Sequence, residues 1–178
     1  MKRVLSLLFV SLLVFVAQVG AAATERRNCR AQHLVRFDGT ELIYTTISLR
    51  NANAAHDVTI ERLTFRDFFG VVVHDSGPAI GVPHPLNSDI APPHDITVVP
   101  RGASFYLRTQ HIWGRDPIPG GDQRGYNMTA VIEFSTKGNP ALFFTSMNGV
   151  TRERDPETMA EGAQRSSYSE SCVDVKSA

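Results

Sequence analysis

The sequence predicts an all-β protein built as a single antiparallel β-sandwich of about seven or eight strands. Apolar and polar residues alternate with a period of two over several short segments, which is typical of strands with one buried face. β-Branched and aromatic residues are dense in these segments, and turn residues separate them at nearly regular spacing. A small closed barrel is the alternative architecture.

The first half of the chain contains four candidate strands. The clearest is LIYTTISLR, in which Ile43, Thr45, Ile47 and Leu49 share one face. The segment VTIERLTF alternates with one slip at Glu61-Arg62, which predicts a β-bulge. The four segments are residues 34–37, 42–50, 58–65 and 71–74.

The second half predicts further strands at residues 96–99, 104–112, 127–134 and 142–147. Residues 137–140 (KGNP) form the strongest turn signal in the chain, and we expect them to join the last two strands as an antiparallel hairpin. Residues 156–164 predict a short C-terminal helix, with Asp155 as its N-cap and Pro156 in its first turn. We expect the polar tail from residue 165 onward to be loose, except where Cys172 ties it down.

The N-terminus reads as a secretory signal peptide. Lys2 and Arg3 precede an apolar run over residues 4–16, and three alanines at 21–23 provide a cleavage site. A retained membrane anchor is the alternative, but the run is shorter than the ~20 residues that a span needs. Cleavage after residue 23 gives a mature domain of residues 24–178 and a periplasmic or secreted location.

Two cysteines, Cys29 and Cys172, lie near the two ends of this domain. Export places them in an oxidising compartment, where an even number of cysteines favours a disulfide. The mature chain keeps 16 basic and 18 acidic residues. This balance gives no reason to expect binding to nucleic acid or to an anionic membrane, and we expect no membrane span after signal cleavage.

Part of the chain resembles a known group of sequences. The segment TTISLRNANAAHDVTIERLTFRD has the shape of an immunoglobulin-like strand pair, and VVPRGASFYL and NMTAVIEFSTKGNPALFFTSMNGV follow it. In this order they resemble a family of small bacterial exported proteins with a domain of unknown function, over residues 31–151. The resemblance implies an immunoglobulin-like sandwich. It implies no activity, so no residue's role is carried over.

Three histidines, His74, His84 and His94, lie in or beside a proline-rich stretch at residues 76–94. Neutral imidazole is a common ligand of zinc and copper, so a metal site is the alternative interpretation of these side chains. Their spacing of ten residues is not that of a zinc motif, whose ligands lie two to five residues apart. The favoured interpretation is a loop with solvated histidines that covers the sandwich edge or recognises a partner.

Aromatic and polar residues offer a second candidate site. Tyr106 and Arg108 share the face of the strand at 104–112 opposite to Phe105, and Trp113 follows at the start of a second loop, residues 114–125. Such a face can bind peptides or sugars. A serine hydrolase is less favoured, because the adjacent residues His74, Asp75 and Ser76 cannot form a triad on an extended segment and no G-x-S-x-G motif occurs.

The sequence therefore predicts an exported, non-catalytic binding or structural protein with no cofactor. Its ligand is unknown, and another periplasmic protein is one candidate partner. A periplasmic zinc- or copper-binding protein is the alternative function, and a hydrolase is the third.

Overall fold

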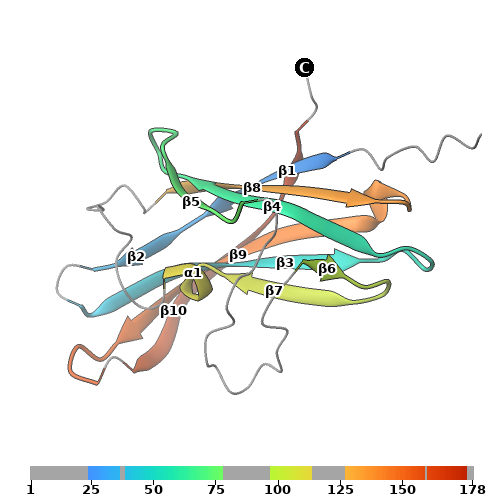
Figure 1. Ribbon diagram of the computed structural model, residues 1–178. Coiled ribbons are helices and arrows are strands. Elements are labelled where there is room, and N and C mark those ends of the chain that lie inside the picture. The colour runs from blue at the N-terminus through green and yellow to red at the C-terminus, as the bar shows by residue number, and fades with distance from the viewer. Residues whose placement is uncertain (1–23, 37–38, 78–96, 114–126, 159, 176–178) are drawn as a thin grey trace, which may run out of the picture.

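A computed structural model of the protein describes residues 24–36, 39–77, 97–113, 127–158 and 160–175 (Figure 1). Two antiparallel sheets face each other, which confirms the predicted β-sandwich. The first sheet has the order β11-β1-β8-β4-β5, with β6 also paired to β4. Its strands are β1 (Glu25–Ala31), β4 (Val58–Arg66), β5 (Val72–Asp75), β6 (Val98–Val99), β8 (Met128–Thr136) and β11 (Val173–Asp174).

The second sheet has the order β10-β9-β3-β2, with β7 also paired to β3. Its strands are β2 (His33–Val35), β3 (Glu41–Asn51), β7 (Ser104–Arg108), β9 (Phe143–Arg154) and β10 (Glu161–Ser171). Two short helical turns complete the described chain, α1 (Gln110–Trp113) and η2 (Pro140–Leu142).

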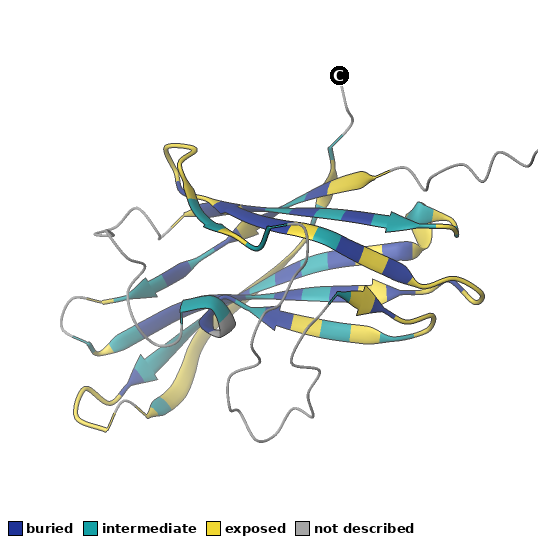
Figure 2. Ribbon diagram, viewed as in Figure 1, coloured by how far each residue is buried: buried dark blue, intermediate teal, exposed yellow. Residues whose placement is uncertain are grey.

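The core lies between the two sheets, where the inward-facing residues of both meet (Figure 2). On β3, Ile47 and Leu49 point inward, whereas Arg50 is exposed, as the alternation predicts. The β4 bulge is confirmed, because the register of β4 against β8 shifts between Ile60 and Arg62. The largest side chains of the core that are fully buried are Phe65, Phe134, Phe143, Ile47, Leu49, Ile60, Leu63, Ile132 and Met147.

The predicted hairpin at residues 137–140 is wrong. The turn exists, since the Asn139 side chain accepts a hydrogen bond from the Ala141 N–H and caps η2. However, β8 pairs with β1 and β4, whereas β9 pairs with β3 and β10. The turn therefore carries the chain from one sheet to the other.

The predicted C-terminal helix is also wrong. Asp155 does cap a turn, because its carboxylate accepts hydrogen bonds from the N–H groups of Glu157 and Thr158, which lower the pKa of Asp155. No helix follows this turn in the described residues: β10 begins at Glu161 and pairs with β9. The tail that we expected to be loose is thus an edge strand of eleven residues.

The strand predicted at residues 104–112 ends early, at Arg108, and α1 follows it. The Thr109 side chain explains the break. Its hydroxyl accepts a hydrogen bond from the Thr45 N–H and donates one to the Gln32 carbonyl. These bonds tie the end of β7 to two neighbouring segments and turn the chain into α1.

The C-terminal residues close one edge of the sandwich. After β10 the chain crosses to the first sheet, where β11 pairs with β1. Cys172 lies at this crossing and forms the predicted disulfide with Cys29 of β1. The disulfide therefore links the first strand of the described domain to its last segment, across a separation of 143 residues.

A buried arginine stabilises the same edge. The guanidinium of Arg27 donates hydrogen bonds to the carbonyls of Phe143 and Pro140 and to the Asp174 carboxylate. It also lies 5.3 Å from the ring centroid of Phe134 and 5.8 Å from that of Phe143. The last rung between β9 and β10 is the bond from Cys172 N–H to Thr145 C=O. Beyond it, where β10 has left the sheet, Arg27 takes the place of a strand partner for Phe143.

Candidate binding site at one end of the sandwich

The residues that the sequence singled out lie in different places. His74 is on β5, Trp113 is in α1, and Tyr106 and Arg108 are on β7. His84, His94 and the loops at 78–96 and 114–126 lie outside the described residues. The structure therefore locates one of the three histidines and the whole aromatic and polar trio.

Trp113 packs into an aromatic cluster at the end of the sandwich. Its ring centroid lies 5.1 Å from that of Phe65, 5.4 Å from that of His33 and 5.9 Å from that of His74. These partners come from both sheets, since His33 is on β2 and the other two are on β4 and β5. Trp113 thus fills the gap between the sheets at this end.

Tyr106 and Arg108 lie elsewhere, on the outer face of β7. They stand opposite Ser48 and Thr46 of β3, while Leu107 between them is buried in the core. Tyr106 is 51% exposed. The trio is therefore split between a polar outer face and the aromatic cluster, and we place no binding site on the three together.

His33 and Thr109 form a histidine–hydroxyl pair, with 3.2 Å between His33 Nδ1 and Thr109 Oγ1. The Thr109 hydroxyl already donates a hydrogen bond to Gln32 C=O, so the imidazole Nδ1 is the donor in the bond between His33 and Thr109. Both residues are almost fully buried. The pair has the geometry of a structural hydrogen bond. We assign no nucleophile to it, and the hydrolase function stays a prediction.

His74 is the described histidine whose charge state the structure informs. It is half-buried against Phe65 and Trp113, and burial lowers its pKa, although the nearby Asp75 carboxylate partly opposes this. Its Nε2 is buried and has no hydrogen-bond partner among the described residues. We therefore expect a neutral imidazole at pH 7, which is the form that binds metals.

The Asp75 carboxylate is paired with the Arg62 guanidinium. The Arg62 guanidinium donates two hydrogen bonds to the Asp75 carboxylate, one of them at 2.8 Å from Nε, and the Gly77 N–H donates a third. These bonds lower the pKa of Asp75 to about 2. Within the part of the chain that the structure describes, no group of three or more His, Cys, Asp or Glu side chains is placed to hold a metal ion.

The turn between β4 and β5 carries an exposed aromatic pair that the sequence analysis did not select. Phe68 and Phe69 are 75% and 71% exposed, and their rings pack edge to face with centroids 5.5 Å apart. The buried Asp67 carboxylate accepts hydrogen bonds from the N–H groups of Phe69 and Val71, both at 2.9 Å. Gly70 has φ +81°, which glycine adopts without strain. The turn is thus held in one conformation that presents both rings to solvent.

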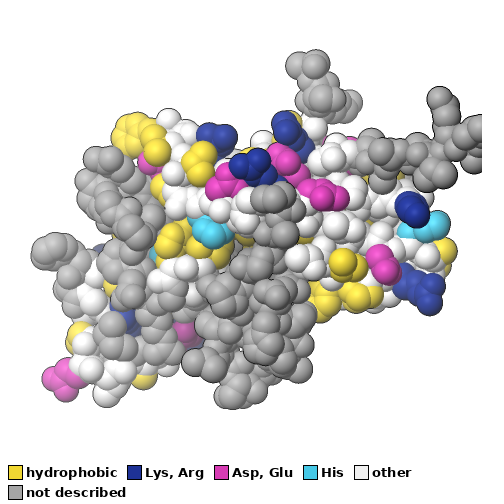
Figure 3. Space-filling view, in the orientation of Figure 1, with side chains coloured by type: hydrophobic (Ala, Val, Ile, Leu, Met, Phe, Trp, Pro, Cys, Tyr) yellow, Lys and Arg dark blue, Asp and Glu magenta, His cyan; other side chains and the backbone are white. Residues whose placement is uncertain are grey.

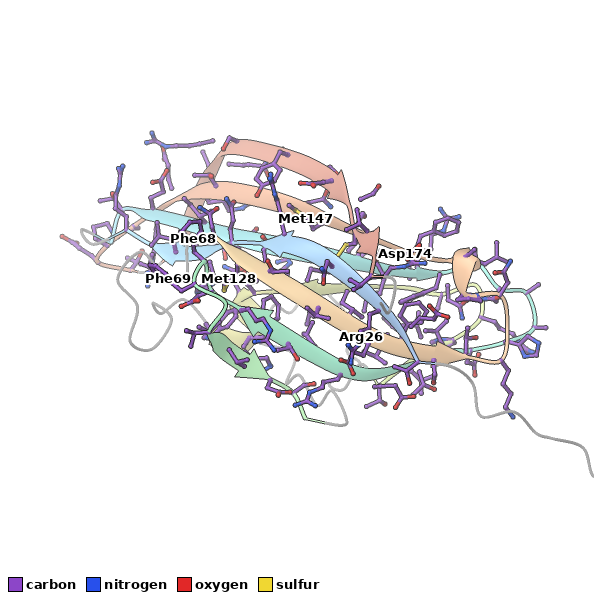
Figure 4. The ribbon with its side chains drawn as sticks, turned by 90° about the horizontal axis from the view of Figure 1, so that it is seen from above. Arg26, Phe68, Phe69, Met128, Met147 and Asp174 are labelled. Atoms are coloured by element: carbon purple, nitrogen blue, oxygen red, sulfur yellow. A yellow bond between two sulfur atoms is a disulfide. The ribbon has the colours of Figure 1, made fainter. Side chains whose placement is uncertain are left out.

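A pocket of about 420 Å³ lies beside this turn. Figure 4 shows Phe68 and Phe69 at the end of the sandwich where Met128 begins β8. The pocket is lined by residues from β1 and the residue after it, the start of β8, the β4–β5 turn and β10. These are Arg30, Ala31, Gln32, Asp67, Phe68, Asn127, Met128, Thr129 and Tyr168.

Tyr168 forms the β10 side of the pocket, and its place depends on a glycine. Tyr168 stands opposite Gly149 in the β9–β10 register. A Cβ at position 149 would lie 2.1 Å from the Tyr168 ring, so the ring covers the space that a side chain would fill. Arg30 adds a cation, and its guanidinium lies 3.7 Å from the Glu170 carboxylate. The pocket therefore combines two aromatic rings, a guanidinium paired with Glu170, the Asp67 carboxylate that is bonded to the turn backbone, and neutral polar groups.

Comparisons with known proteins give no further guide to this site. No protein-family model matches the chain, and neither the curated proteins nor the solved structures contain a match. Among the residues that the structure describes, no helix is both long enough and apolar enough to cross a membrane.

Proposed function

We propose that the protein is an exported, non-catalytic binding protein of the bacterial periplasm or medium, and that it takes a partner into the pocket beside the β4–β5 turn. The observation that carries this proposal is the pocket itself, whose lining includes the aromatic residues Phe68 and Tyr168 and the Arg30 guanidinium, which is paired with Glu170. A few polar groups in a partly apolar concavity are typical of ligand sites. The disulfide supports the exported location, because such bonds persist in oxidising compartments.

The lining suggests the chemistry of the partner. Arg30 favours a carboxylate, the two rings favour an apolar or aromatic group, and Gln32 and Asn127 can hydrogen-bond to a peptide backbone. An extended peptide segment with an acidic side chain next to an aromatic one fits these three requirements. The partner is then another protein of the same compartment.

Photo-crosslinking in the native cell tests this proposal. Benzoylphenylalanine is placed at Asn127, on the pocket, and at Lys137, at the opposite end of β8, as the control. We expect a specific adduct from position 127 only, and we expect Arg30→Ala/Tyr168→Ala to abolish it. Equal adducts from both positions, or an adduct that survives the double substitution, would contradict a binding role for the pocket.

A zinc or copper site is the second candidate, and two observations favour it: burial lowers the pKa of His74, and its Nε2 has no hydrogen-bond partner in the part of the chain that the structure describes. The proposal requires His84 and His94 to complete the ligand set. Calorimetric titration of the metal-stripped mature protein with zinc and with copper tests it, beside the variant His74→Ala/His84→Ala/His94→Ala. Micromolar or tighter binding that the triple variant loses would support the site, and heat that the substitutions leave unchanged would eliminate it.

A further inference from the structure

The β4–β5 turn has a property that the pocket does not explain. Four neighbouring side chains on it are apolar and exposed: Phe68 (75%), Phe69 (71%), Val71 (59%) and Val72 (43%). Figure 3 shows hydrophobic side chains gathered at the corner of the molecule where Figure 1 places this turn. Contiguous exposed apolar groups mark interaction surfaces more often than isolated ones do.

Most backbone N–H groups of the turn, and three of its carbonyls, form hydrogen bonds within the turn or with the Arg66 side chain. Asp67 N–H donates to Val71 C=O at 2.9 Å and Gly70 N–H donates to Asp67 C=O at 2.9 Å. The Asp67 carboxylate accepts hydrogen bonds from the N–H groups of Phe69 and Val71, and the Arg66 guanidinium donates a hydrogen bond to Gly70 C=O at 3.0 Å. A segment that enters a lipid phase must satisfy its backbone groups internally. This turn meets most of that requirement while it remains in water.

Charged groups of both signs lie around the turn. Arg66 is exposed and its head group is held against the turn by Gly70. The Arg30 side chain, on the pocket side of Phe68, is 75% exposed but is paired with Glu170. Asp67 is only 6% exposed and its carboxylate faces the turn. The cation presented beside the apolar tip is therefore that of Arg66, which attracts anionic head groups.

We propose that the β4–β5 turn is a membrane-interface anchor. Phe69, Val71 and Phe68 enter the head-group boundary of an anionic bilayer, while Arg66 contacts the lipid phosphates. The size of the tip favours this occupant over a second copy of the chain. Its two rings expose roughly 300 Å², whereas a stable protein interface needs about 800 Å² from each partner. Shallow, reversible binding to lipid requires no larger surface.

Vesicle flotation tests the anchor with the exported form of the protein, purified after removal of residues 1–23. One set of vesicles is phosphatidylethanolamine and phosphatidylglycerol at 3:1, and the other is phosphatidylcholine alone. We expect the wild type to float with the anionic vesicles, and Phe69→Ser/Val71→Ser to reduce the partition coefficient at least about ten-fold. Neither substituted residue lines the pocket, so this variant leaves the proposed ligand site in place.

Two further variants separate the contributions. Arg66→Gln should reduce partitioning about five-fold on the anionic vesicles and much less on the neutral ones, because one surface cation near anionic lipid contributes about that factor. Phe144→Ser is the matched control, since Phe144 is 51% exposed on β9, in the other sheet, and it should float like the wild type. Unchanged urea midpoints verify that all variants are folded.

Several results would overturn the anchor. The anchor would be overturned if the wild type floated with neither kind of vesicle or if Phe69→Ser/Val71→Ser floated as well as the wild type. It would also be overturned if Phe144→Ser lost as much binding as Phe69→Ser/Val71→Ser. Sedimentation without lipid adds another outcome. A concentration-dependent dimer that Phe69→Ser/Val71→Ser abolishes would make the turn a contact between copies of the chain instead.

Discussion

Arg27 and Asp174 form an ion pair whose two members should contribute very unequally to stability. The Arg27 side chain is 10% exposed and that of Asp174 is 71% exposed. Arg27→Met keeps an unbranched stem beside Phe134 and Phe143 but removes the guanidinium. Asp174→Asn removes only the charge of an exposed group that can still accept a hydrogen bond.

The magnitude follows from what each substitution leaves behind. Without Arg27, the Phe143 carbonyl loses its partner in a buried setting, which costs about 1–3 kcal/mol. The Pro140 carbonyl keeps the hydrogen bond from Phe143 N–H, so it adds little. The lost contacts with two rings add about 1 kcal/mol. We therefore expect Arg27→Met to lower the free energy of unfolding by about 3 kcal/mol, and Asp174→Asn by less than about 1 kcal/mol.

Urea unfolding monitored by the fluorescence of the single tryptophan, Trp113, measures these differences. Arg26 provides the matched control on the same strand, because its side chain is 58% exposed and pairs with Glu133 at 3.1 Å. Arg26→Met should cost less than about 1 kcal/mol. Equal losses for Arg26→Met and Arg27→Met would refute the assignment of Arg27 as a replacement for a strand partner, as would an Asp174→Asn loss as large as that of Arg27→Met.

Three further predictions concern other parts of the fold. Cys29→Ala/Cys172→Ala should lower the free energy of unfolding by up to about 5 kcal/mol, the chain-entropy value for a closed loop of this length, and a change below 1 kcal/mol in urea titrations would contradict it. The pKa of His74 is lowered in the folded state. The contribution of His74 to stability is therefore complete above the unfolded pKa of about 6.5 and falls as the pH drops below that value. The urea midpoint should decrease between pH 7.5 and pH 5.5 by more in the wild type than in His74→Gln, and equal decreases would count against this role. Gly138→Ala should cost about 1–3 kcal/mol in thermal unfolding, because a Cβ there would lie 2.5 Å from the buried Asn53 Oδ1, and an unchanged midpoint would show that Asn53 can move aside.

The strands of the core could be predicted because their sequences record which face is buried. β8 and the second half of β3 alternate between apolar and polar residues, and both lie where the alternation places them; in the first half of β3, Leu42 to Thr45 are buried on both faces. β10 carries no such record. All but the first of its residues are exposed, so no apolar periodicity exists to be found, and pairing with β9 alone defines it as a strand.

Other errors have different physical causes. β1 was not predicted because Arg27 occupies an inward position, where its burial depends on carbonyls more than a hundred residues away. The turn at 137–140 was recognised, but turn chemistry is local and does not specify which sheet receives the next strand. At the candidate site, the Phe68-Phe69 pair is visible in the sequence. Its exposure depends on the Asp67 carboxylate turning inward to the backbone, which only the fold determines.

The crossing of the chain at Cys172 determines that one edge of the domain can be completed only after the C-terminal residues are available. β1, the first strand described, pairs on one side with β11, the last, and its cysteine pairs with the residue just before β11. If the chain is exported as we propose, with its N-terminus first, Cys29 has no intramolecular partner until almost the whole domain has passed. During that interval, oxidation can join Cys29 to another thiol of the compartment as a mixed disulfide. In that case, efficient production should depend on how fast translocation is completed relative to oxidation.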